Sequence, residues 1–294
     1  MVAVAAGRAD AHERTEARAP LRPFMKWVGG KRRVVPHLLG HVNRPMGRYF
    51  EPFVGGGAFF WALADETAQR QREDTWAVLT DVNHRLVRTY RGIRDDLDGV
   101  MARLAVLRDG HNKEQYYDVR AWDVDAERED AAVAAWMIYL NRTGFNGLYR
   151  VNKKGKFNVP FGKYTNPTIL DHRTLRDCSK ALQTVEINHG NYQDVFFKAE
   201  AGDTVYFDPP YVPLNKTSNF TSYTRGGFGP KDQEELRDLA WELKRRDITV
   251  ILSNHDTPEV RELYAEFDIK QILVNRAINS KASKRGGVPE VIIT

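Results

Sequence analysis

The chain has 294 residues, which is enough to bury a sizeable core in one large domain or two smaller ones. Its net charge of +5 permits nucleic acid as a partner, and its single cysteine, Cys178, excludes an internal disulfide and a cysteine-rich zinc site. No stretch approaches the roughly 20 apolar residues that a membrane span needs. Residues 1–20 lack a long apolar core and mix acids with arginines, so they predict a flexible tail rather than a secretory signal. We therefore expect a cytoplasmic protein that does not enter a membrane.

Strand and helix patterns alternate at both ends of the chain. Residues 48–63 predict a short strand, a glycine turn and a helix, and residues 75–83 predict a buried strand that ends in Asp81. Further strands are expected at residues 182–190, 203–210, 248–254, 269–275 and 288–294, with a helix at 230–246. This alternation predicts an α/β sheet formed by residues 21–83 and 182–294.

The middle of the chain, residues 84–181, breaks the alternation. Helical periodicity covers residues 85–107, and a second helix is expected to stop at Gly144. A hairpin is expected at residues 147–162, with its turn at 153–155. We interpret this segment as a domain inserted into the sheet-forming part of the chain.

Positive charge is concentrated in two segments that contain no Asp or Glu, residues 142–170 and 275–289. The cations of the first are Arg142, Arg150, Lys153, Lys154, Lys156 and Lys163, and those of the second are Arg276, Lys281, Lys284 and Arg285. The alternative reading of such a segment is a solvated face, but solvated faces are usually mixed in sign. Clustered cations therefore favour contacts with the phosphates of a nucleic acid.

The sequence VYFDPPYVP, residues 205–213, joins a predicted strand to a stiff loop. Pro209 and Pro210 cannot donate to a sheet ladder, so the strand ends at once and leaves Asp208 and Tyr211 at its tip. Asp-Pro-Pro is also an ordinary way for a chain to leave a strand. Taken alone, this motif leaves a catalytic role and a structural role open.

Three glycines, Gly55 to Gly57, follow a predicted strand and open a helix, where a ligand can approach the backbone closely. Phe60 replaces the third glycine of G-x-G-x-x-G, so the match to a nicotinamide-cofactor site is poor and a bulkier, phosphate-free nucleoside is favoured. Asp81, at the end of the next strand, can bind ribose hydroxyls. The structural alternatives are a flexible turn for the glycines and a helix N-cap for Asp81.

The sequence KWVGGK, residues 26–31, is not a P-loop. Met25 stands where that motif needs its first glycine, and Arg32 replaces the Ser or Thr that follows its lysine. A nucleoside triphosphatase is therefore disfavoured. Lys31 is then compatible with an ordinary surface lysine, and Trp27 with a core aromatic residue.

With these residues in place, the chain resembles the DNA adenine methyltransferase (Dam) family. The similarity runs from Pro23 to Thr294 in the family's order, through FMKWVGGK, EPFVGGG, LNRTGFNGLYRVNKKGKFNVPFGKY, FDPPY, NFTSY and SNHDT. The D-P-P-Y motif is shared by several amino-methyltransferases, whereas the long middle string is much more specific. The resemblance implies a Rossmann-like methyltransferase sheet with helices on both faces, and it makes residues 84–181 a DNA-recognition domain of helices plus a β-hairpin.

The resemblance also implies a reaction. A methyl group passes from S-adenosyl-L-methionine to adenine N6 in double-stranded DNA, in GATC, without a metal. The target base is expected to leave the duplex. The loop at residues 215–229 is long, polar and rich in glycine, so it is able to close over the site. The enzyme is expected to act as a monomer or a weak dimer on DNA. The alternatives are cytosine N4 methylation, which D-P-P-Y also serves, a catalytically silent DNA-binding protein, and a nicotinamide-dependent oxidoreductase.

The matched positions assign expected roles to individual residues. The catalytic residues are Asp208, Pro209 and Tyr211. The cofactor-binding residues are Trp27, Lys31, Glu51, Phe53, Gly55, Gly57, Asp81, Tyr192 and Asp208. The DNA-binding residues are Lys26, Phe145, Asn146, Leu148, Arg150, Asn152, Pro160, Lys163 and Tyr164. Phe145 stands where the family often has tyrosine, and Gly56 where relatives often carry alanine, a difference expected to be harmless.

Overall fold

The computed structural model describes residues 20–66, 72–213, 228–275 and 287–294. Within these ranges the centre is a seven-stranded sheet in the order β3-β2-β1-β4-β5-β7-β6. Neighbours from β3 to β5 pair in parallel, and β7 runs antiparallel to both β5 and β6. The strands are β1 (Tyr49–Glu51), β2 (Ala77–Asp81), β3 (Val185–His189), β4 (Thr204–Phe207), β5 (Thr249–His255), β6 (Ile269–Asn275) and β7 (Gly287–Ile293).

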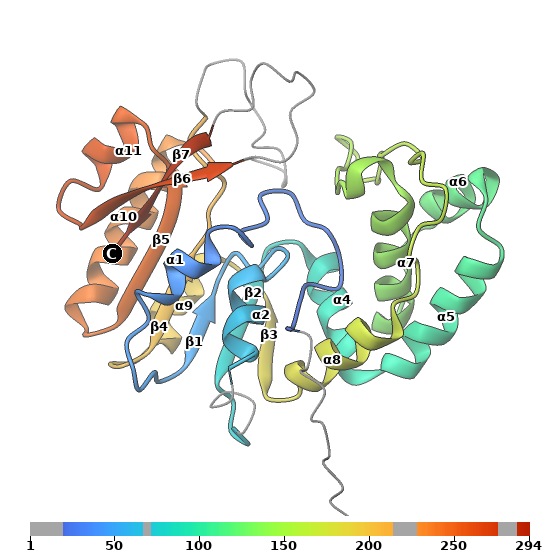
Figure 1. Ribbon diagram of the computed structural model, residues 1–294, viewed down its shortest axis with the longest axis horizontal. Coiled ribbons are helices and arrows are strands. Elements are labelled where there is room, and N and C mark those ends of the chain that lie inside the picture. The colour runs from blue at the N-terminus through green and yellow to red at the C-terminus, as the bar shows by residue number, and fades with distance from the viewer. Residues whose placement is uncertain (1–19, 67–71, 214–227, 276–286) are drawn as a thin grey trace, which may run out of the picture.

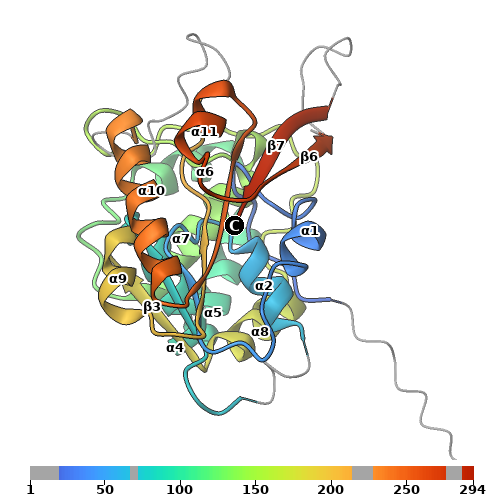
Figure 2. The ribbon, with the colours of Figure 1, turned by 90° about the vertical axis from the view of Figure 1, so that its left-hand side faces the viewer.

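Helices cover both faces of this sheet, because successive strand residues point to opposite sides. Tyr49, Leu79 and Tyr206 belong to the core on one face, under α1 (Val35–Leu39), α2 (Ala58–Ala64) and α4 (His84–Asp95). Phe50, Val78 and Val205 belong to the core on the other face, under α9 (Val195–Lys198), α10 (Pro230–Arg245) and α11 (Pro258–Leu263). Figure 2 shows α9 and α10 on the opposite side of the sheet from α1 and α2. The predicted α/β fold with helices on both faces is confirmed.

A group of helices stands beside the sheet, to its right in Figure 1. It consists of α5 (Leu97–Asp109), α6 (Lys113–Ala121), α7 (Asp130–Thr143) and α8 (His172–Leu182). The helical pattern predicted over residues 85–107 is two helices, because Asp96 leaves the helical conformation and its side chain caps α5 through the Gly99 amide. The predicted helix end at Gly144 is confirmed.

The segment after α7 folds back on itself without a continuous ladder. Two isolated antiparallel bridges, Val151 to Phe157 and Gly144 to Phe161, give an irregular hairpin rather than two regular strands. α4 packs on β2, β3, α7 and α8, and its core is continuous with that of α7. The division into a sheet domain and an inserted domain at residue 84 stays a prediction.

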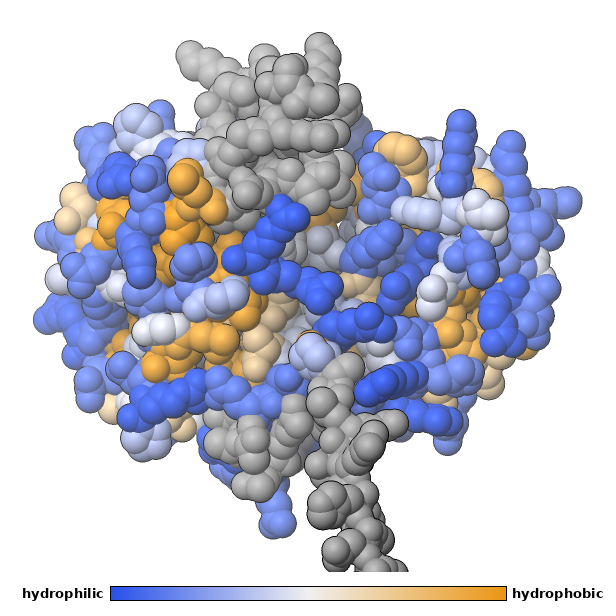
Figure 3. Space-filling model, in the orientation of Figure 1, coloured by the Kyte–Doolittle hydropathy of each residue, from blue (hydrophilic) through white to orange (hydrophobic). Residues whose placement is uncertain are grey.

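No helix in the described ranges is long and apolar enough to cross a membrane. On the face shown in Figure 3, hydrophilic residues are distributed widely, and apolar residues form separate groups between them.

Candidate active site

Acidic residues gather where the parallel strands end. Glu51 is the last residue of β1, Asp81 is the last residue of β2, and Asp208 follows β4 directly. Because β2, β1 and β4 are neighbours and run parallel, their carboxyl ends lie at one edge of the sheet. The structure thus brings together the three acids predicted to contact the cofactor, one of which, Asp208, is also the predicted catalytic acid.

Lys31 and Asp208 form an ion pair at this edge. Lys31 Nζ lies 3.0 Å from Asp208 Oδ1, and it also donates to the Gly29 carbonyl at 2.8 Å. Ser253 Oγ donates to the same carboxylate oxygen at 3.0 Å. The Lys31 side chain is only 9% exposed, and its ammonium lies 4.3 Å from the centre of the Tyr211 ring. The alternative of a surface lysine is therefore wrong.

Tyr211 is fixed from its other end by a residue far along the chain. Its hydroxyl donates to Glu290 Oε2 at 3.2 Å, and its ring lies edge-on to His255 at 4.8 Å. Glu290 is buried in β7, in register with His255 of β5. Lys31, Asp208, Tyr211, Ser253 and Glu290 are termed the Asp208 cluster below.

Side-chain amides fasten the backbone of the D-P-P-Y loop. Gln233 Nε2 donates to the Pro210 carbonyl at 2.9 Å, and Asn254 Oδ1 accepts from the Val212 amide at 3.1 Å. Asn254 Nδ2 in turn donates to Gln233 Oε1 at 3.1 Å. Among the described residues, no hydrogen bond reaches the Pro209 carbonyl. One proline carbonyl is therefore held while its neighbour stays available as an acceptor.

The glycine turn is closely packed. Gly55 and Gly57 have left-handed φ values of 47° and 63°. A Cβ on Gly55 would lie 2.8 Å from Trp27 Cδ1, and one on Gly57 would lie 2.8 Å from the Tyr90 hydroxyl. A Cβ on Gly56 would lie 2.9 Å from Trp27 Cβ, so glycine suits this position better than alanine, and the expectation that glycine is harmless there stays a prediction. The half-buried Trp27 fills the space that these glycines leave open.

Asp81 is bound to the glycine turn rather than used as a helix cap. Its carboxylate accepts from the Gly55 amide at 3.1 Å and from the Asn83 amide at 2.8 Å. Asn83 itself caps α4 by accepting from the Leu86 amide. Burial raises the pKa of Asp81, and the two amide bonds act in the opposite direction. The helix-cap alternative for Asp81 is therefore wrong.

Glu51 is a buried carboxyl with two hydrogen-bond donors. The Tyr49 hydroxyl donates to Oε2 at 2.7 Å, and the Phe60 amide donates to the same oxygen at 3.2 Å. The residue is 3% exposed. Burial is the largest cause that raises the pKa of Glu51 to about 8, and the negative charge of Asp208 adds to it.

Three aromatic rings meet on the other side of β1. Phe53 stacks on Tyr192 with ring centres 5.3 Å apart, and Phe228 lies edge-on to both at 5.7 and 5.8 Å. The Tyr192 hydroxyl is buried and has no hydrogen-bond partner among the described residues. The three rings form an apolar surface beside the carboxyl end of β1.

The basic segment after α7 is mostly exposed. The residues Arg150, Asn152, Lys153, Lys154, Lys156, Pro160 and Lys163 are exposed, whereas Leu148 and Tyr164 are half-buried. Arg142 departs from the expectation, because its guanidinium donates to the Phe24 carbonyl at 2.6 Å inside the fold. Arg142 is thus a structural residue and not part of the exposed basic surface.

The hairpin fixes the side chain of Arg150 and the backbone of the turn. Arg150 donates through Nε to Asn158 Oδ1 at 2.7 Å and through NH2 to the Asn158 carbonyl at 3.1 Å. Asn152 Oδ1 accepts from the amides of Lys154 and Lys156, and Gly155 supplies a left-handed φ of 75°. Asn152 therefore organises the turn, whether or not it also contacts DNA.

Phe145 and its neighbours lie together at the end of α7. Phe145 is 49% exposed and begins a 3-10 turn (Phe145–Gly147), and its amide donates to the Pro160 carbonyl at 2.9 Å. Asn146 has a left-handed φ of 56°. Lys26 Nζ lies 5.1 Å from the centre of the Tyr164 ring. These predicted DNA-binding residues are thus adjacent, although none lies in the Asp208 cluster.

Several expectations fall outside the described residues. They concern the tail, most of the loop at 215–229, and the second basic segment at 276–286. Within the described ranges, no group of three or more His, Cys, Asp or Glu residues could hold a metal ion.

Sequence reasoning missed several residues that contact the site. They are Tyr206, Phe228, Gln233, Ser253, Asn254, His255 and Glu290. The SNHDT string is a usable signal, because it ends the strand that pairs in parallel with β4, from Thr204–Thr249 to Phe207–Leu252. Glu290 offers no such signal.

The same site-bearing regions are matched in known proteins. The family model described as D12 class N6 adenine-specific DNA methyltransferase matches residues 27–278. The Type II methyltransferase M1.LlaDCHI of Lactococcus lactis subsp. cremoris is 40% identical, covering 93% of this chain and 95% of that protein. The Type II methyltransferase M.MjaIII of Methanocaldococcus jannaschii is 38% identical, covering 93% and 98%. The DNA adenine methylase of Vibrio cholerae is 35% identical, covering 92% and 95%. The chain therefore belongs to the D12 class of N6 adenine-specific DNA methyltransferases, a family of enzymes.

Proposed function

We propose that the protein transfers a methyl group from S-adenosylmethionine to N6 of an adenine in duplex DNA. The observation that carries this proposal is the position of Asp208, directly after β4 and in contact with Lys31 and Ser253. Adenine N6 is a poor nucleophile, because its lone pair is delocalised into the ring. A carboxylate and a carbonyl that each accept one N6 hydrogen favour a more tetrahedral nitrogen. Asp208 and the Pro209 carbonyl supply these two acceptors.

The cluster around these acceptors supports the proposal, because catalysis by positioning requires groups fixed before the substrate arrives. Lys31 and Ser253 both contact Oδ1 of Asp208, so we assign Oδ2 to the substrate amine. Gln233 holds the Pro210 carbonyl and thereby fixes the direction of the preceding one. The Tyr211 ring, held by Glu290, offers a surface on which the extruded adenine stacks.

The residues near the ends of β1 and β2 fit S-adenosylmethionine. Asp81 accepts the ribose hydroxyls, and the rings of Phe53, Tyr192 and Phe228 line the adenine of the cofactor. The stack of Phe53 on Tyr192 and the position of Asp81 at the end of β2 support this assignment. Glu51 and Lys31 lie toward the methionine part. When bound, the sulfonium group of the cofactor supplies an electrophilic methyl.

The exposed basic surface fits duplex DNA. We assign residues 84–181 to target recognition, with Arg150 reading guanine and the lysines of the hairpin turn contacting phosphates. Extruding the adenine costs a few kcal/mol, and Phe145, half exposed beside Pro160, replaces lost stacking in the duplex. The target sequence is GATC, and the enzyme acts as a monomer or weak dimer.

The test is methylation of a duplex with one GATC site, using labelled S-adenosylmethionine, followed by nucleoside chromatography and sequencing of the modified DNA. The expected product is N6-methyladenine at GATC, with equal yield in EDTA. N4-methylcytosine as the product would favour the cytosine alternative. DNA binding without any transfer would favour a silent binding protein.

A further inference from the structure

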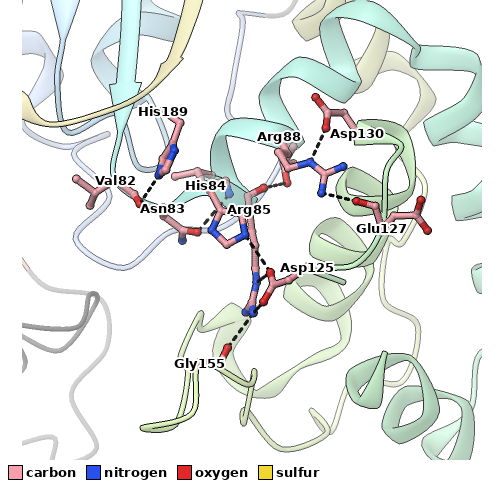
Figure 4. Close-up of polar contacts among 12 residues, drawn as sticks. Val82, Asn83, His84, Arg85, Arg88, Asp125, Glu127, Asp130, Gly155 and His189 are labelled. Atoms are coloured by element: carbon pink, nitrogen blue, oxygen red, sulfur yellow. Dashed lines mark hydrogen bonds and ion pairs between the residues drawn. The ribbon is translucent and has the colours of Figure 1, made fainter. Parts of the chain in front are cut away.

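Arg85, in the first turn of α4, connects that helix to the turn of the hairpin. Its NH2 group donates to the Gly155 carbonyl at 2.9 Å, and Gly155 lies at the hairpin turn. The same guanidinium forms a two-pronged ion pair with Asp125, at 2.7 Å from Nε and 2.5 Å from NH2. Figure 4 shows these contacts converging on the Arg85 side chain. Arg85 lies outside the motifs and the basic segments that the sequence pattern singles out.

The environment of Arg85 fixes its orientation. Its side chain is 8% exposed, its Cζ lies 5.6 Å from the centre of the Trp136 ring, and its NH1 lies 3.4 Å from the Tyr149 hydroxyl. A planar guanidinium held at two edges by one carboxylate has little freedom to rotate. The ion pair with Asp125 therefore orients the Arg85 NH2 group toward the Gly155 carbonyl.

The hairpin turn depends on this outside contact. Its other backbone bonds are internal, from the Asn152 amide to the Lys156 carbonyl and from the Gly155 amide to the Asn152 carbonyl. Among the described residues, Arg85 supplies the hydrogen bond that joins residues 152–156 to the rest of the protein. A turn with few hydrogen bonds and exposed lysines opens easily. A single hydrogen bond from a charged donor therefore supplies a large part of the free energy that keeps the turn closed.

We infer that Arg85 is a positioning residue that holds the hairpin so that Arg150 meets the guanine edge at the angle that two parallel hydrogen bonds need. This inference rests on the proposed function of the hairpin in target recognition. Arg85 is buried and paired with Asp125, so it acts through the turn and not by contacting phosphate itself. A displacement of about 1 Å at the turn is enough to break a bidentate hydrogen-bond pair.

Arg88 provides a matched control on the same helix. Its Nε lies 2.5 Å from Asp130 Oδ1, and its NH1 donates to the Glu127 carbonyl at 2.8 Å. Figure 4 shows Arg85 paired with Asp125, in the segment between α6 and α7, and Arg88 paired with Asp130, the first residue of α7. Within the described residues, Arg88 makes no hydrogen bond to the hairpin. Arg88→Gln therefore removes a comparable ion pair without touching the turn.

The first measurement is amide hydrogen exchange of the DNA-free protein. Arg85→Gln should speed exchange at Asn152 and Gly155 by about tenfold, the scale of one charged hydrogen bond. Arg88→Gln should exchange these amides at the wild-type rate. Equal rates in wild type and Arg85→Gln would overturn the inference, and this result does not depend on any DNA activity.

The second measurement is kcat/KM for a GATC duplex and for one in which adenine replaces the guanine. Arg85→Gln should lower the preference for guanine by about tenfold, with saturating kcat on GATC and cofactor affinity within about twofold of wild type. Arg85→Lys, which keeps the charge, should recover part of the preference. Arg88→Gln should keep all of it.

The outcomes separate the inference from the function on which it rests. Equal losses on both duplexes, with a fall in melting temperature that Arg88→Gln reproduces, would overturn the positioning role in favour of a general structural one. A wild-type enzyme without guanine preference would overturn the proposed specificity and, with it, the recognition role of Arg85. The exchange measurement would still decide whether Arg85 orders the turn.

Discussion

The Asp208 cluster and the hairpin differ in how their charged side chains are held: those of the cluster are paired, and the lysines of the hairpin are exposed. In the cluster, Lys31 and Asp208 are paired, Tyr211 is bonded to Glu290, and the carbonyl of Pro210 is held by Gln233. In the hairpin, Lys153 and Lys154 are exposed to solvent and have no ion pair among the described residues. The side chains of the Asp208 cluster are thus fixed before any ligand arrives, whereas the lysines of the hairpin are free to contact one.

The physical reason for the difference is the cost of removing charge from water. A buried ion pair with a missing partner is strongly destabilising, so every charged group in the cluster needs a fixed counterpart. Exposed lysines stay hydrated and are screened by salt, which makes them suitable for phosphates but unsuitable for aligning a reacting atom. Mutations in the cluster should therefore affect methyl transfer and cofactor binding, and mutations in the hairpin should affect DNA specificity and affinity.

The largest effect is expected at Asp208. Asp208→Ala should lower single-turnover methylation by at least roughly 100- to 1,000-fold, the scale of losing one hydrogen-bond partner of the transition state. DNA affinity should change little, because we assign the phosphate contacts to the hairpin and not to Asp208; some loss of cofactor affinity is compatible with the role. Asp208→Asn, which keeps the shape but loses the charge, should be similarly impaired. Near-normal methylation by either variant would remove Asp208 from the mechanism.

A smaller effect is expected at Asp81, which we propose binds the ribose of the cofactor. Asp81→Asn should weaken S-adenosylmethionine binding by roughly 1.5–3 kcal/mol, because the ribose loses a charged acceptor. Asn83→Ala is the control, since it removes the cap of α4 and costs about 1 kcal/mol of stability without touching the ribose. Calorimetry would contradict the role if both variants bound the cofactor like wild type.

Arg150 and Lys154 test two separate functions of the hairpin, sequence specificity and affinity for any duplex. Arg150→Ala should cost about 1–3 kcal/mol of discrimination at the guanine of GATC, because two hydrogen bonds to O6 and N7 are lost. Lys154→Ala should weaken all duplexes alike and reduce the salt slope by about 0.9, the value for one neutralised phosphate. Methylation sequencing and salt titrations measure the two effects. Unchanged guanine preference in Arg150→Ala would make Arg150 one more phosphate-binding residue.

The comparison also predicts a pH dependence of stability that only the buried region should show. The folded pKa of Glu51 is about 8, above its ordinary value of 4.5, so the folded state binds a proton that the unfolded state releases. This contribution to stability is complete below the unfolded pKa of Glu51 and is lost as pH rises through about 8. The expected slope is about 1.4 kcal/mol per pH unit within that window.

Denaturant unfolding at several pH values measures this slope, with Glu51→Gln as the comparison. The difference in unfolding free energy between the two proteins should change with pH, since glutamine cannot titrate. If Glu51 also faces the positive charge of S-adenosylmethionine, cofactor binding at neutral pH should release a proton, which calorimetry in two buffers detects. A constant difference between wild type and variant would contradict the raised pKa.

Local sequence signals accounted for much of the fold and part of the candidate site. The end of α7 at Gly144, the end of β2 at Asp81 and the placement of Asp208 after β4 were all predicted, because each depends on a few neighbouring residues. The break at Asp96 was missed, since the helical periodicity continues on both sides of a residue that serves as a cap.

Tertiary structure alone decided which distant groups meet. Strand register brought Ser253 to Asp208 and Glu290 to Tyr211, and helix packing brought Arg85 to Gly155. It also withdrew Arg142 from the basic surface and made Lys31 a buried partner instead of a surface lysine. A sequence pattern states which face of an element is apolar, but not which residue lies opposite it. That choice follows from strand order and side-chain packing across the whole core.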